Sequence, residues 1–164
     1  MSEIEVLRMT RRLGQGRKDR ALKRALPASG RIPYGYKHIS REVAPEIIPE
    51  EAEILHKIAQ LFLSHLGYKQ ISLELEKIGH KDRNGKPFAT SSLRNYLRNP
   101  FYIARIEYGR DTRPIPLFTS QGSWTPIFDL KTYSAILSES ARRQSLGPRN
   151  RSSPHIFSGL AFCY

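Results

Sequence analysis

Residues 90–99, TSSLRNYLRN, combine side chains that suit hydrogen bonding and anion binding. At helical spacing Leu93, Tyr96 and Leu97 share one side of this segment. The opposite side then carries the polar set Ser91, Ser92, Arg94, Asn95 and Arg98. A carboxamide such as that of Asn95 can pair with an adenine edge, and a guanidinium group can bind guanine or phosphate. The pattern predicts a short helix, ended by Pro100, whose outer face touches a polar and anionic partner.

The segments before this helix favour such a role over that of a merely solvated helix. Residues 67–79 predict another short helix, with Ile71, Leu75 and Ile78 on its inner face. Residues 80–88, HKDRNGKPF, form a polar turn between the two helices and supply Lys81, Arg83 and Lys86. Two short helices joined by a turn describe a helix-turn-helix, whose second helix enters a major groove. Thr90 is expected to cap that helix, and its first N–H groups could hold a phosphate.

The net charge of +12 is distributed in blocks along the 164 residues. Residues 1–37 hold ten basic and three acidic side chains, and residues 80–110 hold seven and two. The tail from 142 has four arginines and no acid, whereas residues 38–79 and 111–141 are slightly acidic. Alternating blocks indicate a folded scaffold that presents separate cationic surfaces to a polyanion, so nucleic acid is the favoured partner.

Two cationic segments precede the helix-turn-helix. Residues 2–26 predict a protruding helix, because their apolar residues are too sparse to anchor it on a core and Gly14 and Gly16 weaken it. Residues 27–37, PASGRIPYGYK, contain too many prolines and glycines for a helix. This extended peptide suits a minor groove, but it could equally be a linker whose tyrosines pack on the neighbouring domain. Both interpretations stay open at this point.

The remaining segments predict a small mixed domain. Residues 49–66 read as a core helix ending at Gly67, and residues 102–108 as a half-buried strand. Residues 123–128 are its expected antiparallel partner, and Asp129 caps a last helix with Leu130, Tyr133, Ile136 and Leu137 facing inward. The predicted fold is mainly α with a small antiparallel β-hairpin: a helix-turn-helix or winged-helix-like DNA-binding domain preceded by a protruding helix.

Other classes of function find little support in the composition. The single cysteine, Cys163, excludes a disulfide framework within the chain and fits a reducing compartment. No apolar run is long enough to span a membrane, and the N-terminus lacks a secretory signal. His56 and His65 lack metal-ligand spacing. We therefore expect a cytoplasmic protein without a metal site among these residues.

Three motifs, in this order, resemble the recombinase domain of the large serine recombinases, the family of phage integrases and transposon resolvases. They are GRIPYGY (30–36), TSSLRNYLRNPFYIA (90–104) and FSGLAFC (157–163). The resemblance implies five regions: residues 1–26 as the distal part of a long helix leaving a catalytic domain, and 27–37 as a minor-groove linker. Residues 38–141 would form the recombinase domain, 142–154 a basic linker, and 155–164 the first strand of a zinc ribbon, with Cys163 as its first ligand.

The resemblance also implies limits on what this chain does alone. The family's catalytic domain, with its nucleophilic serine, would precede residue 1, and the other zinc ligands would follow residue 164. The chain thus reads as a fragment, natural or expressed, with no catalytic residue, no cofactor and no complete metal site of its own. We expect no DNA cleavage by it. The full-length protein, bacterial or phage-encoded, would hold zinc, bind each site as a dimer and form a tetramer in the synapse.

The predicted function is recognition of the attachment site on double-stranded DNA during integration or excision. A stand-alone helix-turn-helix regulator or excisionase-like protein is the alternative. The sequence does not supply the arginines and histidines that a tyrosine recombinase needs around its tyrosine. It also has no aromatic sheet platform of the kind that RNA-binding modules use. The predicted DNA-binding residues are Arg17, Lys18, Arg20, Arg24, Arg31, Tyr34, Tyr36, Lys81, Arg83, Lys86, Thr90, Ser91, Ser92, Arg94, Asn95 and Arg98.

Overall fold

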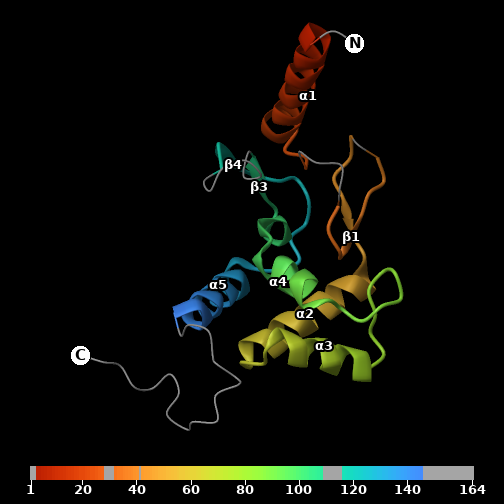
Figure 1. Cartoon of the computed structure of the whole chain (residues 1–164), viewed down its shortest axis with the longest axis vertical. Coiled ribbons are helices and arrows are strands. Elements are labelled where there is room, and N and C mark those ends of the chain that lie inside the picture. Colours follow the sequence, from red (N-terminus) through yellow and green to blue (C-terminus); the bar gives the residue numbers. More distant parts are fainter. Residues whose placement is uncertain (1–2, 28–31, 41, 109–115, 146–164) are drawn as a thin grey trace, which may run out of the picture.

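The computed structural model describes residues 3–27, 32–40, 42–108 and 116–145 (Figure 1). These residues are mainly helical, as predicted, with two small antiparallel strand pairs. The helices are α1 (Glu3–Lys23), α2 (Pro49–Leu63), α3 (Tyr68–Lys77), α4 (Thr90–Arg98) and α5 (Leu130–Ser145), with a 3-10 turn at Pro100–Ile103. Strand β1 (Tyr36–Lys37) pairs with β2 (Glu46–Ile47), and β3 (Arg105–Tyr108) pairs with β4 (Phe118–Gln121). The described residues end at Ser145, the last residue of α5. Most of the expected basic linker (142–154) and all of segment 155–164, including Cys163, therefore lie outside them.

Helix α2 is the central core helix that the sequence predicts. Leu55, Ile58 and Phe62 on its inner face are fully buried, and Pro49 begins it with acids in its first turn. The helix stops at Leu63, earlier than expected, because His65 adopts a left-handed conformation with φ of 67°. Gly67 instead forms the N-cap of α3.

Helices α3 and α4 form the predicted helix-turn-helix. Ile71 and Leu75 of α3 and Leu93 and Leu97 of α4 are buried against α2 and each other. Two details of the prediction are wrong. The helix N-cap is Ala89, without a side-chain hydrogen bond, so Thr90 is the first helical residue. Ile78 follows the end of α3 and is 54% exposed.

The strand expected at residues 102–108 is shorter than predicted. The Asn99 side chain accepts a hydrogen bond from the Phe101 N–H, and Pro100 begins a 3-10 turn there. That turn ends at Ala104, whose φ is 52°, so β3 begins only at Arg105. The alternation of Tyr102, Ile103 and Ala104 is lost because all three are buried.

The expected partner strand, residues 123–128, is also wrong: β3 pairs with Phe118–Gln121. Residues 123–128 instead cover the 3-10 turn. The Trp124 ring stacks on Phe101 at 4.3 Å between centroids, and its indole N–H donates to the Phe101 carbonyl. The N–H groups of Ile127 and Phe128 both donate to the carbonyl of Tyr102. Aromatic packing therefore holds this segment out of the hairpin.

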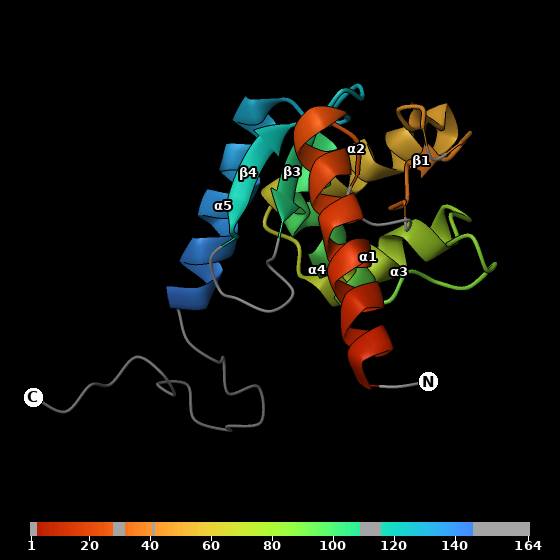
Figure 2. The same cartoon turned by 90° about the horizontal axis from the view of Figure 1, so that it is seen from above.

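Helix α1 protrudes from the rest of the molecule, as predicted (Figure 1), and runs without interruption through both glycines. Its C-terminal half lies beside the β3–β4 hairpin (Figure 2): the Tyr108 hydroxyl donates to the Gly14 carbonyl, and Ala21 is fully buried. Val6, Met9 and Leu13, toward the N-terminus, are each at least half exposed. The C-terminal half of α1 is thus anchored on the domain.

Asp129 caps helix α5, as the sequence predicts, because its carboxylate accepts the Thr132 N–H just inside the helix. Tyr133 and Ile136 face the core, but Leu130 and Leu137 are exposed, contrary to the prediction. The helix continues to Ser145, into the expected basic linker.

The C-terminal turn of α5 is held against the end of α2 by an ionic cluster. The Arg143 guanidinium donates to the carbonyls of Leu66 and Phe62 and lies 4.0 Å from the Phe62 ring centroid. Its Nε donates to the buried carboxylate of Glu139 at 2.7 Å. Arg142 donates twice to the same carboxylate, and His65 lies 3.0 Å from it. A cation at the carboxyl end of α2 also complements the helix dipole.

The Glu139 cluster predicts a specific pH dependence of stability. Hydrogen bonds from Arg142, and then from Arg143 and His65, lower the pKa of Glu139 well below its ordinary value of 4.5. A carboxyl whose pKa is lowered by folding stabilises the fold above its unfolded pKa, and this contribution is lost as pH falls. We expect Glu139→Gln to lose about 1–3 kcal/mol at pH 7, and to lose less additional stability than the wild type on acidification. Urea unfolding at a series of pH values measures both effects.

The matched control is Glu74→Gln, which breaks the exposed ion pair with Lys77. Its effect should stay below about 1 kcal/mol. If wild type and Glu139→Gln lost stability in parallel as the pH fell below 4.5, the ionised Glu139 would not stabilise the fold.

Candidate nucleic-acid interface

The outer face of α4 is accessible in the structure. Thr90, Ser91, Arg94, Asn95 and Arg98 are exposed, and Ser92 is half-buried. On the inner face Leu93 and Leu97 are buried to 1% exposure or less. The side chains predicted from helical periodicity to face outward therefore do so, and the polar set shares one helix surface.

Contacts from behind hold α4 in a fixed orientation. The Tyr96 ring stacks on Tyr34, with centroids 5.5 Å apart and planes at 19°. At the carboxyl end, the Tyr133 hydroxyl donates to the Arg98 carbonyl. Arg94 lies over the Tyr68 ring at the start of α3, 5.9 Å from its centroid. These contacts hold the helix in place, and most polar side chains of its outer face remain exposed.

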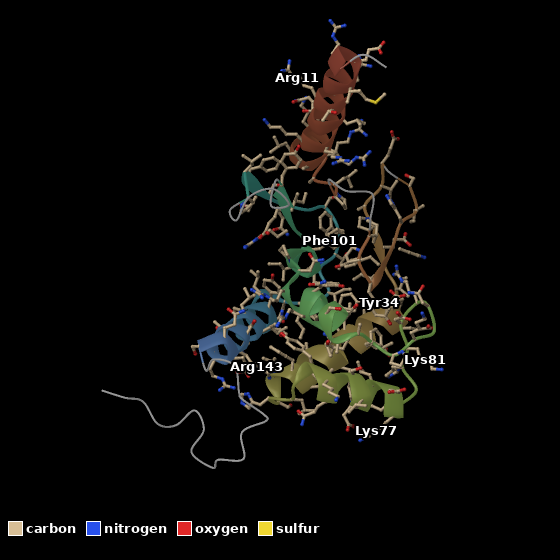
Figure 3. The ribbon with its side chains drawn as sticks, viewed as in Figure 1. Arg11, Tyr34, Lys77, Lys81, Phe101 and Arg143 are labelled. Atoms are coloured by element: carbon tan, nitrogen blue, oxygen red, sulfur yellow. The ribbon has the colours of Figure 1, made fainter. Side chains whose placement is uncertain are left out.

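The turn between α3 and α4 is organised by Asp82. Its carboxylate accepts the backbone N–H groups of Asn84 and Lys86 at 2.8 and 2.9 Å. These hydrogen bonds lower the pKa of Asp82, and the one from the Lys86 N–H contributes most. Lys81 and Lys86 are exposed on this turn (Figure 3 labels Lys81). The turn is thus a defined structure with two cations available to an anionic partner.

Arg83, also predicted to bind DNA, is held by hydrogen bonds within the protein, although its side chain is 43% exposed. Its Nε and Nη2 donate to the two carboxylate oxygens of Glu51 at 2.7 and 2.6 Å, and Nη2 also donates to the Tyr36 carbonyl. The hydrogen bond with Glu51 raises the pKa of Arg83. Glu51 was missed as a site residue. An acid in a first helical turn indicates only helix-dipole stabilisation, and no local pattern pairs it with a residue 32 positions later.

Tyr34 and Tyr36 are part of the core. Tyr36 is fully buried, and its hydroxyl donates to the Thr125 carbonyl; Tyr34 is 7% exposed, and its carbonyl accepts the Tyr102 hydroxyl. Burial raises the pKa of Tyr34 to about 12 and also raises that of Tyr36. Two interpretations of residues 27–37 were open, and the positions of both tyrosines agree with the one in which they pack on the neighbouring domain. Their rings have almost no exposed surface, so the structure gives no support to them as contacts in a DNA groove, and that role stays a prediction.

The other predicted contacts are on or next to α1. Arg17, Lys18 and Arg24 are exposed and Arg20 is half-buried. Arg24 lies 3.7 Å from Glu42 of the β1–β2 connection. The exposed cations extend toward the free end of the helix, where Figure 3 labels Arg11, a residue that the prediction omitted. Arg31 lies outside the described residues.

The described residues contain no group of three or more His, Cys, Asp or Glu side chains that could hold a metal ion. Within the same part of the chain, every helix is too short or too polar to cross a membrane.

A helix-turn-helix whose second helix has an open polar and cationic face defines the class of this domain. A family model described as Recombinase matches residues 49–143, which include α2, α3, α4 and most of α5. The chain belongs to this Recombinase family.

Two solved structures are similar to the chain in fold. One is described as the crystal structure of an LSR–DNA complex, where LSR stands for large serine recombinase; it aligns with a TM-score of 0.71 and 22% identity over 90% of this chain. The other comes from work on the sequence requirements of the Listeria innocua prophage attP site, with a TM-score of 0.70 and 22% identity over 89% of this chain. The chain spans 45% and 58% of these two proteins' lengths. A comparison with curated proteins gives no match.

Gly35 allows a test of whether segment 34–36 packs closely on the core. Gly35 has φ of 94°, and a Cβ added there would lie 2.6 Å from Leu55 Cδ1 and 2.7 Å from Ile127 Cδ1. We expect Gly35→Ala to cost about 2–4 kcal/mol, from backbone strain together with overpacking. Denaturant unfolding measures this loss.

Gly85→Ala is the matched control, because Gly85 also has a positive φ, of 72°, but no atom within 4 Å of an added Cβ. This substitution should lower the free energy of unfolding only by the strain of a left-handed alanine, about 1–2 kcal/mol. Equal losses at the two glycines would mean that the segment is not packed on Leu55 and Ile127.

Proposed function

We propose that this chain recognises the attachment site of a site-specific serine recombinase on double-stranded DNA. The observation that carries the proposal is the outer face of α4: a hydroxyl-, amide- and guanidinium-bearing surface left open by a helix that is fixed from behind. Membership of the Recombinase family and the fold shared with a DNA-bound large serine recombinase support it.

In the proposed complex α4 enters the major groove. Asn95 pairs with an adenine edge, Arg94 or Arg98 binds guanine or phosphate, and Ser91 and Ser92 allow close approach. Thr90 and the first-turn N–H groups hold a phosphate, and Lys81 and Lys86 contact phosphates of the same DNA strand. The cations of α1 and of segment 27–37 contact the backbone and minor groove beside it.

The cleavage chemistry is assigned to another part of the recombinase. There a serine would attack a DNA phosphate and form a phosphoserine link, and a zinc ribbon that includes Cys163 would add further DNA contacts. The recombinase would act in the cytoplasm, as a dimer on each site and as a tetramer during synapsis. The function proposed for this chain is to choose the site and hold the cleavage domain over it.

Selection of bound duplexes from a random pool, followed by footprinting, tests the proposal. Enrichment of a defined motif, with protection of both a major groove and the adjacent minor groove, is the expected result. Recovery of an unenriched pool would reject sequence-specific recognition.

Asn95→Ala is expected to relax selection at one base pair. The variant loses the paired hydrogen bonds to one base, so discrimination there should fall by about 1–3 kcal/mol. Competition binding with single-base-pair variants of the selected site measures it. Lys77→Ala, on α3 in an ion pair with Glu74, is the control that should leave every position unchanged. A uniform loss across all sequences would contradict the assigned base contact.

Arg17→Ala is expected to weaken binding evenly across sequences, because its proposed contact is with phosphate. The slope of log affinity against log salt should become shallower by roughly 0.9, the amount that one neutralised phosphate contributes. Titrations at several salt concentrations measure this slope. An unchanged slope would remove α1 from the proposed DNA contacts, and Lys77→Ala again provides the charge-matched control.

A further inference from the structure

The contact between segment 34–36 and the helix-turn-helix is made through Tyr34. Its ring stacks on Tyr96 of α4 and meets the Phe88 ring edge-on, 5.5 Å between centroids in each case. Arg83 places its guanidinium carbon 5.6 Å from the centroid of the same ring. Figure 3 shows Tyr34 close to α4 and to the start of α2. The segment is therefore in direct contact with the recognition helix and with the turn that precedes it.

One ion pair holds the backbone of this segment. Glu51 Oε2 accepts the Gly35 N–H at 2.6 Å and an Arg83 N–H at 2.6 Å, and the same Arg83 nitrogen donates to the Tyr36 carbonyl at 2.7 Å. A second Arg83 nitrogen reaches Glu51 Oε1. The Glu51 side chain is only 15% exposed, whereas that of Arg83 is 43% exposed, so the pair is partly shielded from solvent on its carboxylate side.

Three parts of the chain thus meet at Glu51 and Arg83: the first turn of α2, the turn between α3 and α4, and the peptide units of residues 35 and 36. Immediately after them, Lys37 and His38 are exposed. On the other side of the contact, α4 exposes Asn95. The ion pair therefore links the segments that carry these two exposed surfaces.

We propose that the Glu51–Arg83 pair is a positioning device that fixes the spacing between the DNA contacts of segment 32–38 and those of α4. The inference rests on the proposed function, since it assumes that both surfaces contact one duplex. It assigns no base contact to Arg83. The guanidinium instead determines which two DNA subsites can be occupied together.

The geometry indicates which substitutions release this constraint. Arg83 uses a planar fork toward Glu51 and a further N–H toward the Tyr36 carbonyl, which an ammonium group cannot reproduce. Arg83→Lys keeps the charge but loses the fork. Glu51→Gln keeps the volume and an acceptor for the Gly35 N–H, but loses the ionic contact. Both leave the buried rings of Tyr34 and Tyr36 in place.

The experiment uses the selected duplex and derivatives with one base pair inserted or deleted between the footprints of the two subsites. One base pair moves them by about 3.4 Å and roughly a tenth of a turn. For the wild type we expect each change to weaken binding by roughly tenfold or more, as a mismatched base pair does. For Arg83→Lys and Glu51→Gln we expect weaker binding to the selected duplex, and a spacing penalty reduced to roughly threefold or less.

Glu74→Gln is the matched control. It breaks an exposed ion pair with Lys77 within α3, and neither residue belongs to the two surfaces proposed to contact DNA. It should keep the wild-type spacing penalty. Circular dichroism and thermal melting establish that each variant is folded, and the spacing penalty is a ratio that a partly unfolded population does not alter.

The outcomes separate this inference from the function on which it rests. Wild-type protein that selects no motif would reject both. A wild type that selects a motif but tolerates altered spacing would overturn the positioning role alone. The same holds if both variants fold and keep the full spacing penalty, or if Glu74→Gln loses it as completely as they do.

Discussion

The arrangement of the domain depends on the burial of Tyr34 and Tyr36 in a core made by α2, α4 and the 3-10 turn. Tyr36 packs between Phe101 and Tyr102, and Tyr34 packs on Tyr96. Burying such aromatic groups stabilises folding through the apolar area removed from water. The polar backbone that enters the core with them must then find partners, and Glu51, Arg83 and Tyr102 supply them. A segment that reads as a linker is therefore an integral part of the domain.

Helical periodicity predicted the parts of the site that lie on regular structure. In α4 the positions of Leu93 and Leu97 alone fix which side faces the core, and the exposed set follows from the 3.6-residue repeat. The same reasoning identified α2 and α3. These predictions succeeded because apolar residues at helical spacing identify the buried face of a helix, whichever element it packs against.

The predictions failed where long-range contacts override the local pattern. The alternation over residues 102–108 predicts a strand, but at its start the Asn99 cap and the Trp124–Phe101 stack favour a 3-10 turn. The Arg83 side chain looks like a surface cation within a basic turn, yet its partner is 32 residues earlier in the chain. No periodicity within either segment encodes such a pairing, so the sequence alone could not identify it.

Net charge alone therefore overstates how many cations can serve a polyanionic partner. Arg83, Arg142 and Arg143 contribute to the charge of +12, but their hydrogen bonds go to Glu51 and Glu139. Withdrawing Arg83 to contact a phosphate would leave the largely buried carboxylate of Glu51 without this counterion, and withdrawing Arg142 or Arg143 would leave Glu139 with one arginine in place of two; both changes are unfavourable. Arg94 and Arg98 face a different constraint: Arg94 rests over an aromatic ring, and Arg98 engages the fold through its backbone carbonyl. The distribution of buried carboxylates, more than the count of basic residues, thus determines which cations of this domain are available for binding.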